Sequence, residues 1–79
     1  MDLHKYITVS SDVQFGKPVF KGTRVPVQSL FFHLEQGVSL NEFLEDFPGV
    51  KREQAEAVLE SAALIFQSAN WERIDEIIA

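Results

Sequence analysis

The chain has 79 residues, no cysteine and a formal net charge of -5, which excludes disulfide bonds and thiolate metal sites as sources of stability. A chain this short forms a single domain, so we expect residues 1–79 to fold as one unit supported by self-association or by a partner protein. No apolar run approaches the roughly 18 residues of a membrane span, and the N-terminus lacks the basic flank and apolar stretch of a signal peptide, so we expect a cytoplasmic protein.

The charge is unevenly distributed along the chain. Residues 1–24 hold four basic and two acidic side chains, a net charge of +2, whereas residues 25–79 hold three basic and ten acidic side chains, a net charge of -7. Nucleic acid is attracted to basic surfaces and repelled by acidic ones. We therefore expect any surface for nucleic acid to lie mainly in the N-terminal third of the chain.

Residues 1–26 are predicted to form a small β-ribbon of two or three strands. Tyr6–Val9 is a run of strand-forming residues. Further along, residues 19–20 and 24–25 flank a short turn as the two arms of a hairpin do. Gly22 lies in that turn and can adopt the positive φ angle that a tight turn requires. Two prolines in this region cannot donate to a β-ladder, so the strands should be short.

The segment Gly16–Val27, GKPVFKGTRVPV, has the glycines and cations of a phosphate-binding loop but not its order. Such a loop places four residues between its glycines and then runs through Gly-Lys-Ser/Thr into a helix. Here five residues separate Gly16 from Gly22, Thr-Arg follows Gly22, and Pro18 removes an N–H donor. We interpret the segment as a turn that presents its cations outward, with no pocket beneath it.

Two short helices are expected after the ribbon. The first begins near Val27, runs for about ten residues and has Gly37 as its C-terminal left-handed residue. The second begins after Ser39, which can cap it while Glu42 reaches back, and it stops at Pro48. The predicted apolar faces are Val27, Leu30, Phe31 and Leu34 in the first helix, and Leu40, Phe43, Leu44 and Phe47 in the second.

A third helix has the clearest periodicity in the chain and starts after Lys51, which occupies the cap position without a capping side chain. Its predicted apolar face is Ala55, Val58, Leu59, Ala62, Ile65, Phe66 and Ala69. A C-terminal tail, residues 70–79, either forms a short fourth helix or continues the third. The tail has an apolar stripe of Trp71, Ile74, Ile77 and Ile78, which we predict to bind protein: its own core, a second copy or a different partner.

The sequence thus predicts a mainly α fold: a helix-turn-helix bundle of three to four helices with a small N-terminal β-ribbon. Residues 1–26 form the ribbon, 27–69 the helix-turn-helix core and 70–79 the helical tail. Candidate DNA-binding residues lie on the ribbon and at the start of the third helix: Lys17, Lys21, Arg24, Lys51, Arg52 and Gln54.

An alternative interpretation of these residues is that the ribbon cations only keep an edge strand soluble. Glu53, Glu56 and Glu60 are also expected on the outward face of the third helix, where they oppose deep insertion into DNA. DNA binding and its absence therefore both stay open at the level of the sequence.

Catalytic and metal sites are not indicated by any pattern in the chain. His4 and His33 have no partners at metal-ligand spacing, and His33 is expected to be a structural histidine. No Ser/His/Asp set or pair of convergent carboxylates can be assembled. We expect a non-enzymatic protein without a cofactor, a metal or a small-molecule substrate, and treat an enzyme or nucleotide binder as a rival class.

The stretch GKPVFKGTRVPV, followed by GVSLNEFLEDFP and the third helix, resembles the domain-of-unknown-function family 433 over about Ile7 to Ala63. This resemblance implies a bacterial or archaeal origin and a homeodomain-like helix-turn-helix fold. It also implies the role of antitoxin in a toxin-antitoxin pair whose toxin is a PIN-domain ribonuclease. No catalytic residue is carried over. The chain departs from the family pattern at Lys51, where members commonly have Thr or Ser, and in its acidic third helix.

We therefore expect a homodimeric, antitoxin-like domain that binds a PIN-type ribonuclease toxin and operator DNA. The alternative is a dimeric protein-interaction module that does not bind DNA. The salt dependence of DNA binding separates the two, because contacts to phosphates weaken steeply as salt is raised.

Overall fold

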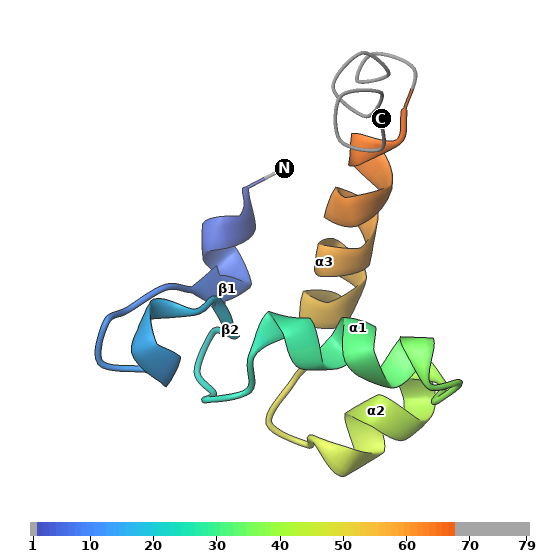
Figure 1. Cartoon of the computed structure of the whole chain (residues 1–79), viewed down its shortest axis with the longest axis horizontal. Coiled ribbons are helices and arrows are strands. Elements are labelled where there is room, and N and C mark those ends of the chain that lie inside the picture. The colour runs from blue at the N-terminus through green and yellow to red at the C-terminus, as the bar shows by residue number, and fades with distance from the viewer. Residues whose placement is uncertain (1, 68–79) are drawn as a thin grey trace.

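The computed structural model describes residues 2–67, which form a two-stranded antiparallel sheet and three α-helices (Figure 1). The elements in chain order are β1 (Ile7–Thr8), β2 (Val19–Phe20), α1 (Val27–Glu35), α2 (Leu40–Asp46) and α3 (Arg52–Ile65). The prediction of a mainly α fold with a small N-terminal ribbon is confirmed. The predicted tail, with Trp71, Ile74, Ile77 and Ile78, lies outside the described residues, as does Ala69.

The sheet pairs β1 with β2, and the predicted hairpin forms beside it. β1 runs antiparallel to β2, with Ile7 opposite Phe20 and Thr8 opposite Val19. In the hairpin, the Phe20 N–H donates to the Val25 carbonyl at 3.0 Å and the Val27 N–H donates to the Pro18 carbonyl at 2.9 Å, on either side of an antiparallel bridge between Val19 and Pro26. The second arm is not a strand of its own, because the chain enters α1 at Val27.

The turn after β2 forms where the sequence places it. The Thr23 N–H donates to the Phe20 carbonyl at 3.0 Å, and Gly22 has a φ of 82°. The Thr23 hydroxyl donates to the same carbonyl at 2.8 Å and accepts from the Val25 N–H at 3.0 Å. A positive φ at this position explains why the turn contains glycine.

The starts of α1 and α2 agree with the local signals in the sequence. α1 begins at Val27, directly after Pro26, and Gly37 has the predicted positive φ of 83° just past its end. α2 is capped by Ser39, whose hydroxyl oxygen accepts from the Glu42 N–H at 3.1 Å. The Ser39 hydroxyl also donates to the Glu42 carboxylate at 3.1 Å, so these two residues brace the helix start.

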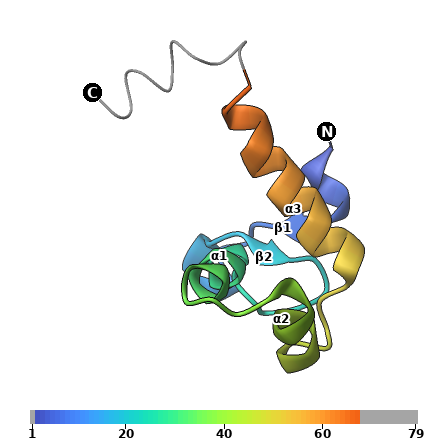
Figure 2. The same ribbon diagram turned by 90° about the vertical axis from the view of Figure 1, so that its right-hand side faces the viewer.

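α3 is only partly covered by the rest of the domain. Ala55 and Val58 are buried, and Leu59 packs against the core. The predicted apolar face continues to Phe66, but Ile65 and Phe66 are exposed, so that part of the prediction is wrong for the described residues. Figures 1 and 2 show the reason: the C-terminal half of α3 extends beyond α1, α2 and the sheet, which therefore cannot cover it.

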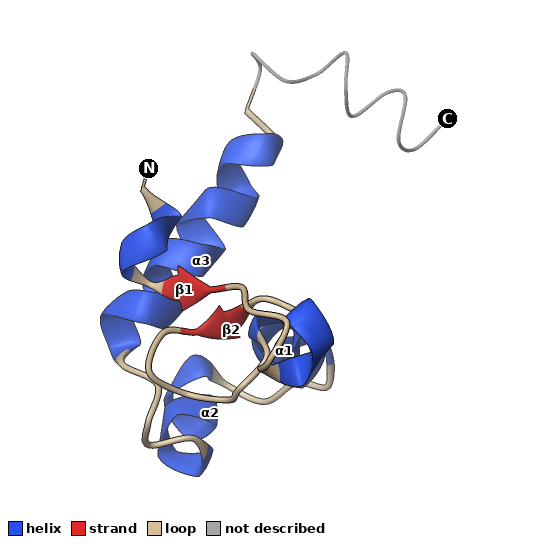
Figure 3. Cartoon of the chain, turned by 90° about the vertical axis from the view of Figure 1, so that its left-hand side faces the viewer, coloured by secondary structure: helices blue, strands red, loops and turns tan. Residues whose placement is uncertain are grey.

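The core lies where the sheet meets the three helices. Figures 2 and 3 show the sheet between α3 on one side and α1 with α2 on the other. Buried side chains from each of these elements and from the loop before α3 form one cluster: Phe20, Leu30, Phe43, Val50, Ala55 and Val58. Among residues 2–67, no helix combines the length and the apolar character that a membrane crossing requires.

Candidate nucleic-acid interface

Three lysines from separate parts of the chain line one open hollow of about 310 Å³. Lys5 belongs to a short N-terminal 3-10 helix, Leu3–Lys5, which we call the N-terminal turn. Lys21 belongs to the turn after β2, and Lys51 directly precedes α3. We call this feature the lysine hollow; the other residues that line it are Tyr6, Gly22, Gly49, Glu53 and Gln54. The expectation that no pocket lies beneath the ribbon is therefore wrong, because the docking of α3 against the turn creates one.

The lysine hollow is basic although the chain as a whole is acidic. Its lining includes three lysines and one acid, Glu53, whereas the formal net charge of the chain is -5. Like charges repel one another, so lysines that lie close together favour an anion between them. The two glycines at its edge add no side-chain bulk, and a Cβ at Gly22 would meet nothing within 4 Å. The hollow is therefore open to an anionic group.

Gln54 holds the walls of the lysine hollow together. Its side-chain Nε2 donates to the Tyr6 carbonyl at 3.1 Å and to the Lys21 carbonyl at 3.0 Å. Its Oε1 accepts from the Lys51 N–H at 2.8 Å, which satisfies a donor at the start of α3. Gln54 is only 6% exposed. The prediction that it faces outward to contact DNA is wrong, because both amide hydrogens and the amide oxygen are used inside the protein.

Three of the predicted DNA-binding residues line the lysine hollow: Lys21, Lys51 and the buried Gln54. Lys17 lines a different hollow, beside α1. Arg52 donates from its guanidinium to the Asn41 side-chain oxygen of α2. Arg24 is exposed, and its side chain does not line the lysine hollow. Whether any of these cations binds DNA stays a prediction.

Sequence reasoning missed Lys5 as a member of this cluster. The residue reaches the lysine hollow because the Lys21 N–H donates to the Tyr6 carbonyl at 2.8 Å, which fixes the N-terminal turn beside the turn after β2. The Lys21 ammonium also donates to the His4 carbonyl at 3.4 Å. The basic character of residues 1–24 was the available signal, but the pairing that unites these lysines is not visible in the sequence.

The outward face of α3 does not add to the basic surface. Glu53, Glu56 and Glu60 are all exposed, as the sequence predicted. These acids repel phosphate groups, and Glu53 lies in the first turn of α3 itself. The lysine hollow lies at that end of the helix.

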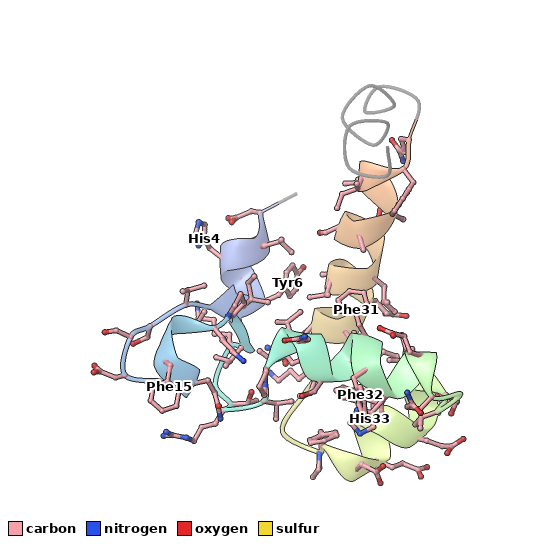
Figure 4. All side chains as sticks on the ribbon, viewed as in Figure 1. His4, Tyr6, Phe15, Phe31, Phe32 and His33 are labelled. Carbon is pink, nitrogen blue, oxygen red and sulfur yellow. The ribbon has the colours of Figure 1, made fainter. Side chains whose placement is uncertain are left out.

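His33 has a structural role, as predicted. Its Nδ1 lies 2.6 Å from the Ser29 carbonyl oxygen within α1. The ring packs edge-on against three phenylalanines, Phe32, Phe43 and Phe47, and Figure 4 shows it on the same helix as Phe31. Among residues 2–67, no group of three His, Asp or Glu side chains could hold a metal ion together.

These features define a small, mainly α-helical domain with a two-stranded sheet and an open basic hollow. A family model described as "Protein of unknown function (DUF433)" matches residues 7–62, so the chain belongs to this family. The matched range runs from β1 into α3 and includes Lys21 and Lys51. No match was found among curated proteins or among solved structures.

Proposed function

We propose that the protein is a non-enzymatic, antitoxin-like domain that contacts nucleic-acid phosphates through the lysine hollow and binds a PIN-type ribonuclease toxin. The observation that carries the nucleic-acid part is the meeting of Lys5, Lys21 and Lys51 at one hollow in an otherwise acidic chain. The toxin is proposed from the family resemblance in the Gly16–Val27 segment and the helices that follow it.

Phosphate contact is the chemistry that suits this lining. An ammonium group is a point charge with three donors and binds a phosphate oxygen regardless of the base sequence. In our proposal α2, the turn and α3 act as a homeodomain-like helix-turn-helix unit that meets DNA at the start of α3. The exposed Glu53, Glu56 and Glu60 support a shallow contact with the phosphate backbone over insertion of α3 into the major groove.

The toxin-binding surface is proposed at the far end of α3. Ile65 and Phe66 are 50% and 65% exposed. Exposed apolar side chains at the end of a helix favour contact with a protein.

A titration of the full chain against double-stranded DNA at 50 and 200 mM salt tests the nucleic-acid part. Three phosphate contacts give a log-log slope of about -2.7, so the fourfold rise in salt should weaken binding about 40-fold. Absence of binding at 50 mM salt would overturn this part of the proposal. Purification of the chain together with a co-expressed PIN-type ribonuclease from its own host tests the toxin part separately.

The second candidate function is a dimeric protein-interaction module that does not bind DNA. The acidic outward face of α3 favours it, because a helix that reads DNA needs basic or amide side chains at that face and Gln54 is buried. A stable dimer that shows no DNA binding at 50 mM salt would support this function over the first.

A further inference from the structure

A second hollow, mainly apolar, lies between the ribbon and α1. It consists of two adjoining parts of about 430 and 370 Å³ that share Lys17, Pro26 and Gln28. We call it the ribbon-α1 groove; its remaining lining residues are Ile7, Pro18, Val27 and Phe31 in the first part, and Gln14, Ser29 and Phe32 in the second. None of these residues belongs to the lysine hollow.

One exposed aromatic side chain lines the ribbon-α1 groove, and a second follows a lining residue in the chain. Phe32 lines it and is 58% exposed. Phe15 lies between Gln14 and Lys17 in the chain and is 98% exposed, and Figure 4 shows its ring pointing away from the domain. A phenylalanine side chain has no polar group that can hydrogen-bond to water. Groups of exposed apolar side chains mark interaction surfaces.

The backbone around Phe15 is held by hydrogen bonds. Gln14 and Phe15 have φ angles of 50° and 56°, a left-handed conformation that non-glycine residues rarely adopt. The Gln14 Nε2 donates to the Arg24 carbonyl at 3.1 Å, and the Lys17 N–H donates to the Gln14 carbonyl at 3.1 Å. These bonds fix the backbone that carries Phe15 next to Gln14, which lines the groove.

The charge around the ribbon-α1 groove selects an acidic partner. Lys17 is the charged residue that lines the groove: it lines both parts, and neither part is lined by an aspartate or a glutamate. A groove that is apolar inside and cationic at its edge is complementary to a segment with apolar and acidic side chains.

Such a segment exists in this chain. Residues 70–79, NWERIDEIIA, combine the apolar Trp71, Ile74, Ile77 and Ile78 with three acids and one arginine. We propose that residues 70–79 of one copy bind in the ribbon-α1 groove of a second copy. The apolar side chains would fill the groove, and Glu72, Asp75 or Glu76 would pair with Lys17.

The position of α3 favours the second copy as the acceptor. Figures 1 and 2 agree that the C-terminal end of α3 stands clear of α1 and the sheet, which carry the groove. Exchange between two copies also pairs each segment with one groove, which is the reciprocal arrangement of a two-fold dimer. This inference does not rest on the proposed binding of nucleic acid.

Trp71 is the sole tryptophan of the chain, so its fluorescence reports directly on the segment. In the full chain, we expect its emission to lie at shorter wavelength than in the urea-unfolded chain and to move toward the unfolded value on dilution. Light scattering should show a dimer over the same range of concentration. Both results follow if Trp71 enters an apolar groove of another copy.

Lys17→Glu tests the contact without disturbing the core, because Lys17 is exposed. We expect this variant to raise the dimer dissociation constant about tenfold or more and to return Trp71 emission toward the unfolded value at equal concentration. Arg52→Glu is the matched control: it reverses one exposed charge at the start of α3 and removes the hydrogen bond to Asn41, both outside the groove, and should keep both properties. Circular dichroism verifies that both variants are folded.

Three outcomes would overturn the inference. The first is an emission maximum equal to that of the unfolded chain at all concentrations. The second is a monomer whose Trp71 emission is blue-shifted and independent of concentration, which would place the segment in its own groove. The third is an equal response of the Lys17→Glu and Arg52→Glu variants. None of these results bears on DNA binding, which is measured separately.

Discussion

Gln54 and Lys21 are 33 positions apart in the chain, yet the Gln54 Nε2 lies 3.0 Å from the Lys21 carbonyl oxygen. This hydrogen bond joins the first turn of α3 to the turn after β2, and a second bond from the same amide nitrogen reaches the Tyr6 carbonyl. The buried Gln54 side chain therefore fixes the position of α3 relative to Tyr6 and to the turn after β2, which form the walls of the lysine hollow.

Replacing Gln54 with leucine should destabilise the protein by about 2 to 4 kcal/mol, because it leaves the Lys21 carbonyl and the Lys51 N–H without their partner and removes one of the two donors to the Tyr6 carbonyl. Urea unfolding followed by circular dichroism measures the change. Glu53→Ala removes an exposed neighbour on the same helix and should change stability by no more than about 0.5 kcal/mol. A loss below about 1 kcal/mol for Gln54→Leu would contradict the role given to this amide.

The burial of Gln54 could not be predicted from the sequence alone. Gln54 lies one helical turn before Val58, beside the apolar face, and its polarity suggested exposure. Gln54 is buried because the Tyr6 and Lys21 carbonyls lie where its side-chain amide can donate to them. The position of these carbonyls depends on the pairing of β1 with β2. The same pairing explains why Lys5 was missed.

Features that depend on neighbouring residues were predicted correctly. Ser39 caps α2, Gly37 ends α1 and Gly22 occupies its turn, because capping and positive φ angles are decided within a few residues. The strand segments were predicted, but the pairing of β1 with β2 was not, because strands of two residues have little pattern and ten residues separate the two strands. Strand pairing over that distance depends on the packing of the whole domain.

Gly22→Val should destabilise the protein by about 1 to 2 kcal/mol, because a β-branched residue is strained at the φ of 82° that the turn requires. Thermal unfolding compared with the wild-type chain measures this effect. Gly49→Ala is the matched control: Gly49 shows no positive φ, and a new Cβ would make an ordinary contact at 3.5 Å with Thr23. If the Gly22 variant is as stable as the wild-type chain, the turn does not require a positive φ at position 22.

Phe43→Ala should be the most damaging of these substitutions. The Phe43 side chain is 0% exposed, and its ring centre lies 6.3 Å from that of Phe20 and 4.8 Å from that of Phe47. Removing a buried aromatic ring costs about 3 to 5 kcal/mol, a large share of the stability of a small domain. We expect loss of cooperative unfolding or a strongly lowered Tm. A Tm within a few degrees of the wild-type value would contradict this placement of the ring.

Replacing Ser39 with alanine removes the side chain that accepts from the Glu42 N–H at the start of α2. The expected loss is about 1 kcal/mol, the usual effect of deleting an N-cap. Ser39→Asp retains an oxygen in the same position and should restore most of that stability. Urea unfolding of the two variants provides the comparison, and an equal loss in both would show that the cap is not the source of the effect.

The lysine hollow makes the proposed nucleic-acid contact testable one charge at a time. Lys21→Ala and Lys51→Ala each remove a cation from the hollow, and the double variant should lower the log-log salt slope of DNA binding by about 2, because each phosphate contact contributes about 1. Arg24→Ala removes an equal charge from the ribbon outside the hollow and should keep the slope of the wild-type chain. Fluorescence anisotropy at several salt concentrations yields all of these slopes. If Arg24→Ala lowers the slope as much as either lysine variant, binding depends on the general charge of the N-terminal third, and the hollow is not the site.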